Sequence, residues 1–173
     1  MADILPSVTQ EDAFIALRAF ILTLVGCEVV RAQQNRVAMP TGSFVLLTQL
    51  SAIPLETNTD TWTATTKSVE RPTQFTIQID CYGPLSGDRA QTIATMLRDS
   101  YAVDQFALQG FDMAPLYAGD AHQMPLIDGE EQYEERWTFD AVLQLNPVIT
   151  VTTETADTLV MNGLIPVDVI YPA

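Results

Sequence analysis

Two stretches of the chain, 75–84 and 131–147, alternate between apolar and polar residues. Successive side chains of an extended strand point to opposite faces, so this period of two predicts two half-buried strands. The apolar positions are Phe75, Ile77, Ile79 and Cys81 in the first stretch, and Tyr133, Trp137, Phe139, Ala141, Leu143 and Leu145 in the second. The opposite, polar faces hold no arrangement typical of a catalytic site. We therefore expect a sheet that presents a surface.

Helical periodicity occurs in two segments. Thr9 and Asp12 form a capping-box pattern ahead of the first apolar stripe. Ser86 or Asp88 is expected to cap a second helix. Its core-facing stripe is Ala90, Ile93, Ala94 and Leu97. A shorter apolar piece, 103–108, follows this helix.

The remaining apolar runs predict further strands. The candidates are 28–32, 43–53, 148–153, 159–161 and 164–169, the last two joined by an Asn-Gly turn. The Thr-rich segment 57–70 is expected to be a loop leading into an exposed strand, with 61–70 forming a hairpin with 74–82. Residues 1–173 are thus predicted to be a single α+β domain, a mainly antiparallel curved sheet with two principal helices packed on one face.

The charge balance excludes several classes of partner. The chain has 22 Asp and Glu against 8 Lys and Arg, a formal net charge of −14. Nucleic-acid binding by phosphate neutralisation needs clustered cations, and an anionic membrane surface would repel this charge. The most hydrophobic helical segment, 14–25, contains Arg18 and is too short to span a bilayer. We expect no membrane association, and synthesis in a reducing cytoplasm with Cys27 and Cys81 as buried free thiols.

Residues suited to catalysis or metal binding are sparse. His122 is the single histidine, and Asp120 is close enough in sequence to orient it, so a small hydrolase using this pair is one alternative. No serine or cysteine motif accompanies the pair. One histidine and two distant cysteines do not make a zinc site, and the acidic cluster at 128–135 lacks the spacing of a calcium loop. We predict a protein that is not an enzyme and has no metal or cofactor.

Aromatic and charged residues are the candidates for contacts with other molecules. Trp62 lies in the Thr-rich segment, where an exposed tryptophan is hard to justify without a partner. Tyrosine and arginine are enriched at protein interfaces. The interface candidates are Trp62, Tyr82, Tyr117, Tyr133, Glu134 and Arg136. Tyr133 shares a face with Trp137 and Phe139, so these three are most simply core residues, and a subunit interface is the other interpretation for Tyr133.

Short motifs follow one another in a distinctive order along the chain. They are Gln33-Gln-Asn-Arg36 followed by Pro40-Thr-Gly42, then Ile79-Asp-Cys-Tyr-Gly-Pro84 before a helix, Pro115-Leu-Tyr117, Gln132-Tyr-Glu-Glu-Arg-Trp137 and Asn146-Pro147. In order and spacing the chain resembles the neck or tail terminator proteins of long-tailed bacteriophages. The resemblance runs from the first helix nearly to the C-terminus.

This resemblance implies a non-enzymatic virion protein with a curved sheet covered by helices on one side. Such proteins assemble as a ring, usually hexameric, on the head-proximal end of the tail tube, where they stop tube polymerisation and offer a docking surface to the head connector. The implied partners are other copies of the chain, the tail tube protein and head connector or adaptor proteins. The implied location is the virion neck or tail, after synthesis in the host bacterial cytoplasm.

The charge can be fitted to that role. Six copies at −14 each would carry a formal charge of −84. A channel lined with part of this charge would repel phosphates, so DNA would pass through without specific binding. A head–tail adaptor or the tail tube protein itself is the alternative within the same structural class.

Overall fold

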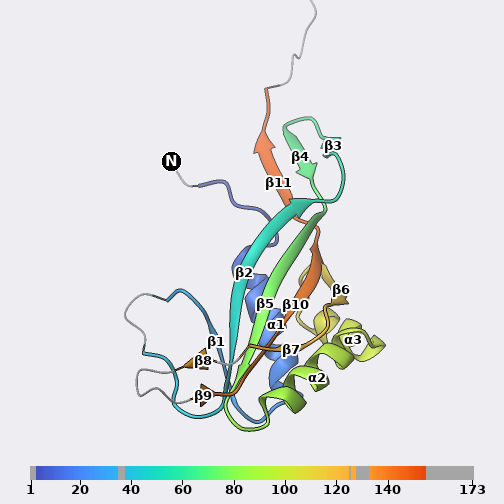
Figure 1. Cartoon of the computed structure of the whole chain (residues 1–173). Coiled ribbons are helices and arrows are strands. Elements are labelled where there is room, and N and C mark those ends of the chain that lie inside the picture. The colour runs from blue at the N-terminus through green and yellow to red at the C-terminus, as the bar shows by residue number, and fades with distance from the viewer. Residues whose placement is uncertain (1–2, 35–37, 125, 128–132, 155–173) are drawn as a thin grey trace, which may run out of the picture.

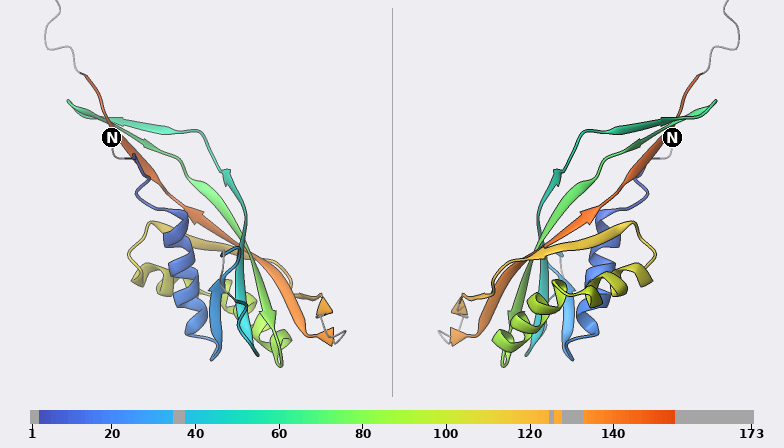
Figure 2. Two further views of the ribbon diagram at one scale, coloured as in Figure 1. Left: turned by 90° about the vertical axis from the view of Figure 1, so that its left-hand side faces the viewer. Right: turned by 90° about the vertical axis from the view of Figure 1, so that its right-hand side faces the viewer.

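The computed structural model describes residues 3–34, 38–124, 126–127 and 133–154. Within them, six strands form a main sheet, and three helices lie on one of its faces (Figure 1, Figure 2). The strands of this sheet are, in spatial order, β1 (Glu28–Arg31), β2 (Phe44–Pro54), β5 (Thr73–Tyr82), β10 (Arg136–Leu145) and β6 (Met113–Ala118), with β7 (His122–Gln123) also paired to β10. The predicted α+β class is confirmed.

The two alternating segments pair with each other inside the main sheet. β5 and β10 are antiparallel along their full lengths, with Tyr82 opposite Arg136 at one end. β2 lies antiparallel on the other side of β5, and β1 is parallel to β2. The predicted strands at 28–32 and 43–53 and the mainly antiparallel sheet are therefore confirmed.

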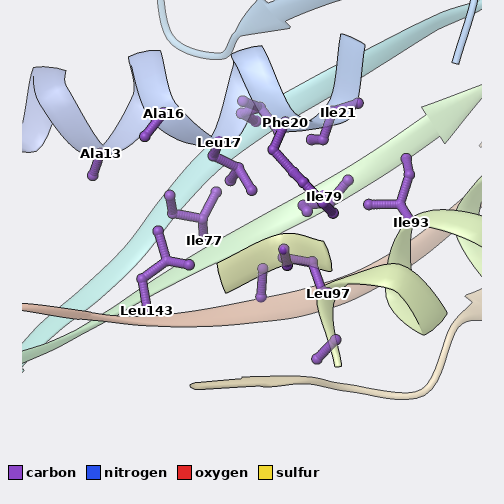
Figure 3. Packing of buried hydrophobic residues seen from close by; sticks show 14 of the residues in the cluster. Ala13, Ala16, Leu17, Phe20, Ile21, Ile77, Ile79, Ile93, Leu97 and Leu143 are labelled. Carbon is purple, nitrogen blue, oxygen red and sulfur yellow. The ribbon is translucent and has the colours of Figure 1, made fainter. Parts of the chain in front are cut away.

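The apolar faces of β2, β5 and β10 meet the helices in one core (Figure 3). The helices are α1 (Gln10–Leu22), α2 (Ser86–Leu97) and α3 (Ser100–Leu108). Leu17 and Phe20 of α1 lie close to Ile77 and Ile79 of β5, and all four side chains are fully buried. Full burial of one such side chain contributes roughly 1.5–3 kcal/mol. The stripe predicted for α2 (Ala90, Ile93, Ala94 and Leu97) faces the same core.

One of the two predicted helix caps is confirmed. The Thr9 hydroxyl accepts a hydrogen bond from the Asp12 main-chain N–H at 3.2 Å, and the Asp12 carboxylate accepts one from the Thr9 N–H at 2.8 Å. For α2, the prediction that Ser86 or Asp88 caps the helix is wrong. Leu85 is the N-cap, with φ at 66° and no side-chain cap. Ser86 is already helical, and its side chain is buried, so it does not turn back to cap the helix.

A third helix accounts for the apolar piece at 103–108. Asp99 caps α3, since its carboxylate accepts from the Tyr101 main-chain N–H at 2.9 Å. Ala102 and Phe106 bury the inner face of α3, so three helices cover the sheet where two principal ones were expected. None of these described helices is long and apolar enough to cross a lipid bilayer.

A second, smaller sheet extends beyond the helices (Figure 1, Figure 2). It consists of β11 (Val148–Thr152), β4 (Thr66–Glu70) and β3 (Thr59–Trp62), in that order. β4 is antiparallel to both of its neighbours. We call these three strands the arm sheet.

The predicted hairpin between 61–70 and 74–82 is wrong. β4 pairs with β3 and β11, whereas β5 pairs with β2 and β10. Prolines mark the boundary between the two sheets: Pro54 ends β2, Pro72 separates β4 from β5, and Pro147 separates β10 from β11. Proline has no N–H for a strand ladder, so the chain changes pairing partners there instead of reversing direction.

Some predictions lie outside the described residues. They are the strand candidates at 159–161 and 164–169, the turn between them, and the part of the acidic cluster at 128–132.

Cys81 gives a prediction about the pH dependence of stability. Both cysteines are free thiols, Cys81 buried and Cys27 half-buried. Burial, with a smaller contribution from Cys27, raises the pKa of the Cys81 thiol from 9.0 to about 12. Above pH 9 this thiol therefore ionises in the unfolded chain but stays neutral in the folded one, so stability falls as pH rises toward 12.

We expect this thiol alone to lower the free energy of unfolding by about 1.4 kcal/mol between pH 8 and pH 10. Urea denaturation of the parent chain and of Cys81→Ala at both pH values checks it. The variant should lack this part of the decrease, and equal decreases in the two chains would contradict the assignment.

Candidate functional site

One face of the main sheet has no helix against it. Its side chains come from alternate positions of the central strands, in cross-strand rows such as Thr48, Gln78 and Asp140. Asp140 is exposed, and Thr48 and Gln78 are half-buried. We call this surface the open face. The polar sides predicted for the two alternating segments lie on it, as a surface-presenting sheet requires.

A buried ion pair anchors one end of the open face. Asp80 is only 1% exposed, although its side chain lies on the face without helices. Arg136 donates to its Oδ1 through Nη2 at 3.0 Å and Nε at 3.2 Å, and Gln78 donates to both carboxylate oxygens at 2.9 and 3.0 Å. Asp80 is therefore saturated with donors, and its charge is compensated within the subunit.

Tyr82 and Arg136, two of the interface candidates, meet beside this pair. The Arg136 guanidinium lies over the Tyr82 ring at 5.6 Å, and that ring stacks on Phe44 at 4.6 Å. Burial raises the pKa of the Tyr82 hydroxyl, with Asp80 and Glu134 acting in the same direction and Arg136 against it. Tyr82 is only 6% exposed, so most of its surface is already used inside the subunit.

Tyr133 does not belong to the core. It is 78% exposed, so the prediction that placed it in the core with Trp137 and Phe139 is wrong. The alternation does not extend back past Glu135, because Tyr133 belongs to a separate short strand that precedes β10. This strand, β9 (Tyr133–Glu134), pairs with β8 (Leu126–Ile127). Tyr133 therefore remains a candidate for contact with another molecule.

Tyr117 lies on β6, an edge strand of the main sheet, and is exposed. The Arg98 guanidinium lies 4.5 Å from its ring centroid. Arg98 also donates to the Ala118 main-chain oxygen through both Nε and Nη2, and it pairs with Asp120 at 3.5 Å. One arginine thus ties α2 to this edge, a role that the sequence did not suggest beyond its place near the end of a helix.

Trp62 lies on the arm sheet and is 61% exposed. Lys67, the single lysine of the chain, is directly opposite on β4, with Nζ 4.8 Å from the Trp62 ring centroid and 2.7 Å from an Asp60 carboxylate oxygen. Such a contact stabilises by about 0.5–1 kcal/mol at an exposed site. It fixes the tryptophan on the arm surface while leaving most of the ring free.

The arrangement of His122 and Asp120 does not match the hydrolase alternative. The His122 Nδ1 lies 3.4 Å from the main-chain oxygen of Asp120, not from its carboxylate, which faces Arg98. Both residues are exposed, and the described residues hold no group of three or more His, Cys, Asp or Glu side chains that could bind a metal. The candidate surfaces of the described chain are therefore suited to contact with other molecules.

The structure gathers some of the interface candidates and separates the others. Tyr82, Glu134 and Arg136 lie near one another at one end of the main sheet, Tyr117 lies on the β6 edge, and Trp62 lies on the arm sheet. Sequence reasoning missed Lys67 and Arg98. The sequence places a lysine a few residues after the tryptophan in the Thr-rich segment. This spacing indicates a cross-strand pair only when the β3–β4 hairpin is already known.

A comparison with known protein families gives a match. The sequence profile of a family described as phage neck terminator protein matches residues 11–169. No curated protein matches the chain.

Loss of one partner from the Asp80–Arg136 pair should be costly. Arg136→Met leaves a buried carboxylate without its cation, so we expect a loss of about 3 kcal/mol in the free energy of unfolding. Urea denaturation measures it. The double variant Asp80→Leu/Arg136→Met is the control, because it removes both charges and should recover most of the loss. A single variant as stable as the parent chain would contradict the assigned role.

Proposed function

Because the chain belongs to the phage neck terminator protein family, whose members are structural and non-enzymatic components of the virion neck, we propose that its copies form a ring, six in number, at the head-proximal end of the tail tube. The ring ends polymerisation of the tube and joins the tail to the head connector. Its partners are other copies of the chain, the tail tube protein below it and connector or adaptor proteins above it.

The observation that carries this proposal is the division of the molecule into a helix-covered body and an arm sheet. The arm sheet extends past the helices, and all of β3 is exposed (Figure 2). A ring built from one kind of subunit needs two different surfaces on each copy, one for each neighbour. The two edge strands of the arm sheet, β3 with its exposed tryptophan and β11, supply two such surfaces.

The open face supports a second contact for the same subunit. It is broad and polar, and its charged pair is internally compensated, so it can lie against a partner without leaving Asp80 or Arg136 unpaired. We propose that the tail tube protein and the connector bind polar surfaces such as the open face. Contact between copies of the chain is assigned to the arm sheet.

A ring that ends a tube can be tested by its effect on tube length. Purified tail tube protein polymerised with the chain should give short tubes that carry a terminal ring, as seen by negative-stain electron microscopy. Extended tubes made from the chain alone would instead identify it as a tube protein. A ring that leaves tube length unchanged would favour a head–tail adaptor and overturn the proposal.

Trp62 should be important for this assembly. Trp62→Ser removes a large exposed anchor, and interface tryptophans of this kind are often worth about 2 kcal/mol or more, so we expect the ring to dissociate roughly thirtyfold more readily. Sedimentation velocity over a concentration series measures it. Leu108→Ser is the matched control, because Leu108 is also a large exposed apolar side chain but lies at the end of α3. Equal effects of the two variants would count against Trp62 as an anchor.

The acidic charge should keep the assembly from adhering to DNA. With a net charge of −14 per copy, the protein is expected to cause no mobility shift of duplex DNA at 0.15 M salt. Lowering the salt should not produce binding, because phosphates and protein repel each other. Binding that strengthens at low salt would show a basic lumen and refute this part of the proposal.

A further inference from the structure

Arginine side chains occupy both edges of the main sheet. At β1, Arg18 donates through Nε to the Val29 main-chain oxygen at 3.0 Å. At β6, Arg98 donates to the Ala118 main-chain oxygen, through Nε at 2.8 Å. A charged side chain bonded to an edge carbonyl disfavours the addition of another strand there. The main sheet is therefore poorly suited to growth across a subunit boundary.

The outer edge of β3 has no such protection. The Thr63 N–H donates inward to the Thr66 oxygen at 2.8 Å, so the main-chain groups of Asp60 and Trp62, at alternate positions, point outward. Among the described residues, nothing bonds to these outward groups. The whole strand is exposed.

In the part of the chain that the structure describes, the outer edge of β11 is free over its distal half. Ser7 closes the base of this edge, with its N–H donating to the Val148 oxygen and its hydroxyl accepting from the Val148 N–H, both at 2.9 Å. The Thr153 N–H donates inward to Thr65 at 2.9 Å, so Thr150 and Thr152 present their main-chain groups outward. Within the described part of the chain these outward groups have no hydrogen-bond partner.

The sequence of β11 favours pairing. Its five residues, Val148 to Thr152, are all β-branched and uncharged, and none is proline. Natural sheets usually guard an exposed edge with lysine, proline or a covering segment. An unguarded edge of strongly β-favouring residues is a template for a strand from another chain.

The two free edges match in direction and in face. β3 and β11 are both antiparallel to β4, so they run the same way, and a neighbouring copy in the same orientation would pair β3 with β11 in parallel. In the register that would set Trp62 opposite Val151 of the next copy, the Trp62 main chain would hydrogen-bond to Thr150 and Thr152 of that copy. Within one arm sheet, Trp62, Lys67 and Val151 already share a face, so the pairing continues this face across the boundary.

We infer that the arm sheets of adjacent copies join edge to edge, with β3 of one copy added in parallel to β11 of the next. The contact uses two different edges of each subunit, so it is heterologous and closes into a ring at a suitable rotation. The exposed Trp62 ring is then partly covered by Val151 of the neighbour. The inference rests on the proposed ring and names the contact that holds it together.

Engineered disulfides test the pairing. Thr61 and Thr150 lie on the other face of the arm sheet, and the proposed register places Thr61 of one copy beside Thr150 of the next, at roughly the 4.8 Å spacing of neighbouring strands, which a disulfide can bridge. The double variant Thr61→Cys/Thr150→Cys should form a ladder of covalent oligomers under mild oxidation. Each single variant and the parent chain, which retains Cys27 and Cys81, should not.

A proline variant tests the main-chain hydrogen bonds. Thr150→Pro removes an outward N–H without touching the bonds to β4, so the subunit should fold while the ring dissociates roughly tenfold more readily or worse. Thr150→Val is the control, since it also loses the hydroxyl that contacts Ser68 at 3.0 Å but keeps the N–H. Circular dichroism checks the fold, and sedimentation velocity measures assembly.

The outcomes separate this inference from the proposed function. A ladder from the double variant, together with loss of rings in Thr150→Pro alone, supports the inference. Cross-linking of either single variant shows like edges pairing with each other and overturns it. Rings that end tubes normally, without a ladder and with Thr150→Pro unaffected, overturn the inference but leave the proposed function standing. Failure of the parent chain to end tubes overturns the proposed function whatever the cross-links show.

Discussion

The pairing of β5 with β10 is the interaction on which the rest of the structure depends. The two strands are far apart in sequence, yet they pair in register along their full lengths and bury one alternating face of each against three helices. This pairing sets Tyr82 opposite Arg136, brings Asp80 within reach of Arg136, and leaves the other face without helices. A slip of one residue would exchange the apolar and polar faces, so the hydrophobic core itself fixes the register of the open face.

A second constraint is the treatment of strand edges. At each edge of the main sheet an arginine bonds one outward main-chain carbonyl, that of Val29 or that of Ala118. The arm sheet begins where prolines interrupt the ladder, and among the described residues both of its edges keep outward main-chain groups without a partner. A single subunit therefore has one sheet with protected edges and one sheet with unprotected edges. In the proposed ring, the body supplies stability and the arm supplies the contact between copies, where exposed main-chain groups and Trp62 lie together.

Much of the fold could be predicted from the chain. Alternation at 75–84 and 131–147 predicted the central strands, although the second strand begins only at Arg136. The Thr9 and Asp12 pattern predicted the start of α1, and the order of short motifs indicated the family. The errors have physical causes. The false hairpin came from treating Pro72 as part of a turn, and the wrong cap at α2 came from ignoring that the core would take the Ser86 side chain. The candidate site was less accessible, because Arg98 and Lys67 act through neighbours that only folding supplies.

The sequence by itself determined the α+β class, the surface-presenting sheet, the acidic character and the structural family, because periodicity, charge and motif order are properties of the linear chain. Tertiary structure decided which edges are free, which polar residues are buried and which aromatic side chains are available. Asp80 and Tyr82 read as surface residues, yet they are buried by contacts with Gln78, Arg136 and Phe44. The burial of a side chain and the exposure of a strand edge depend on residues that are distant in sequence. A pattern of period two therefore predicts which face of a strand a residue lies on, but not which residues pack against that face.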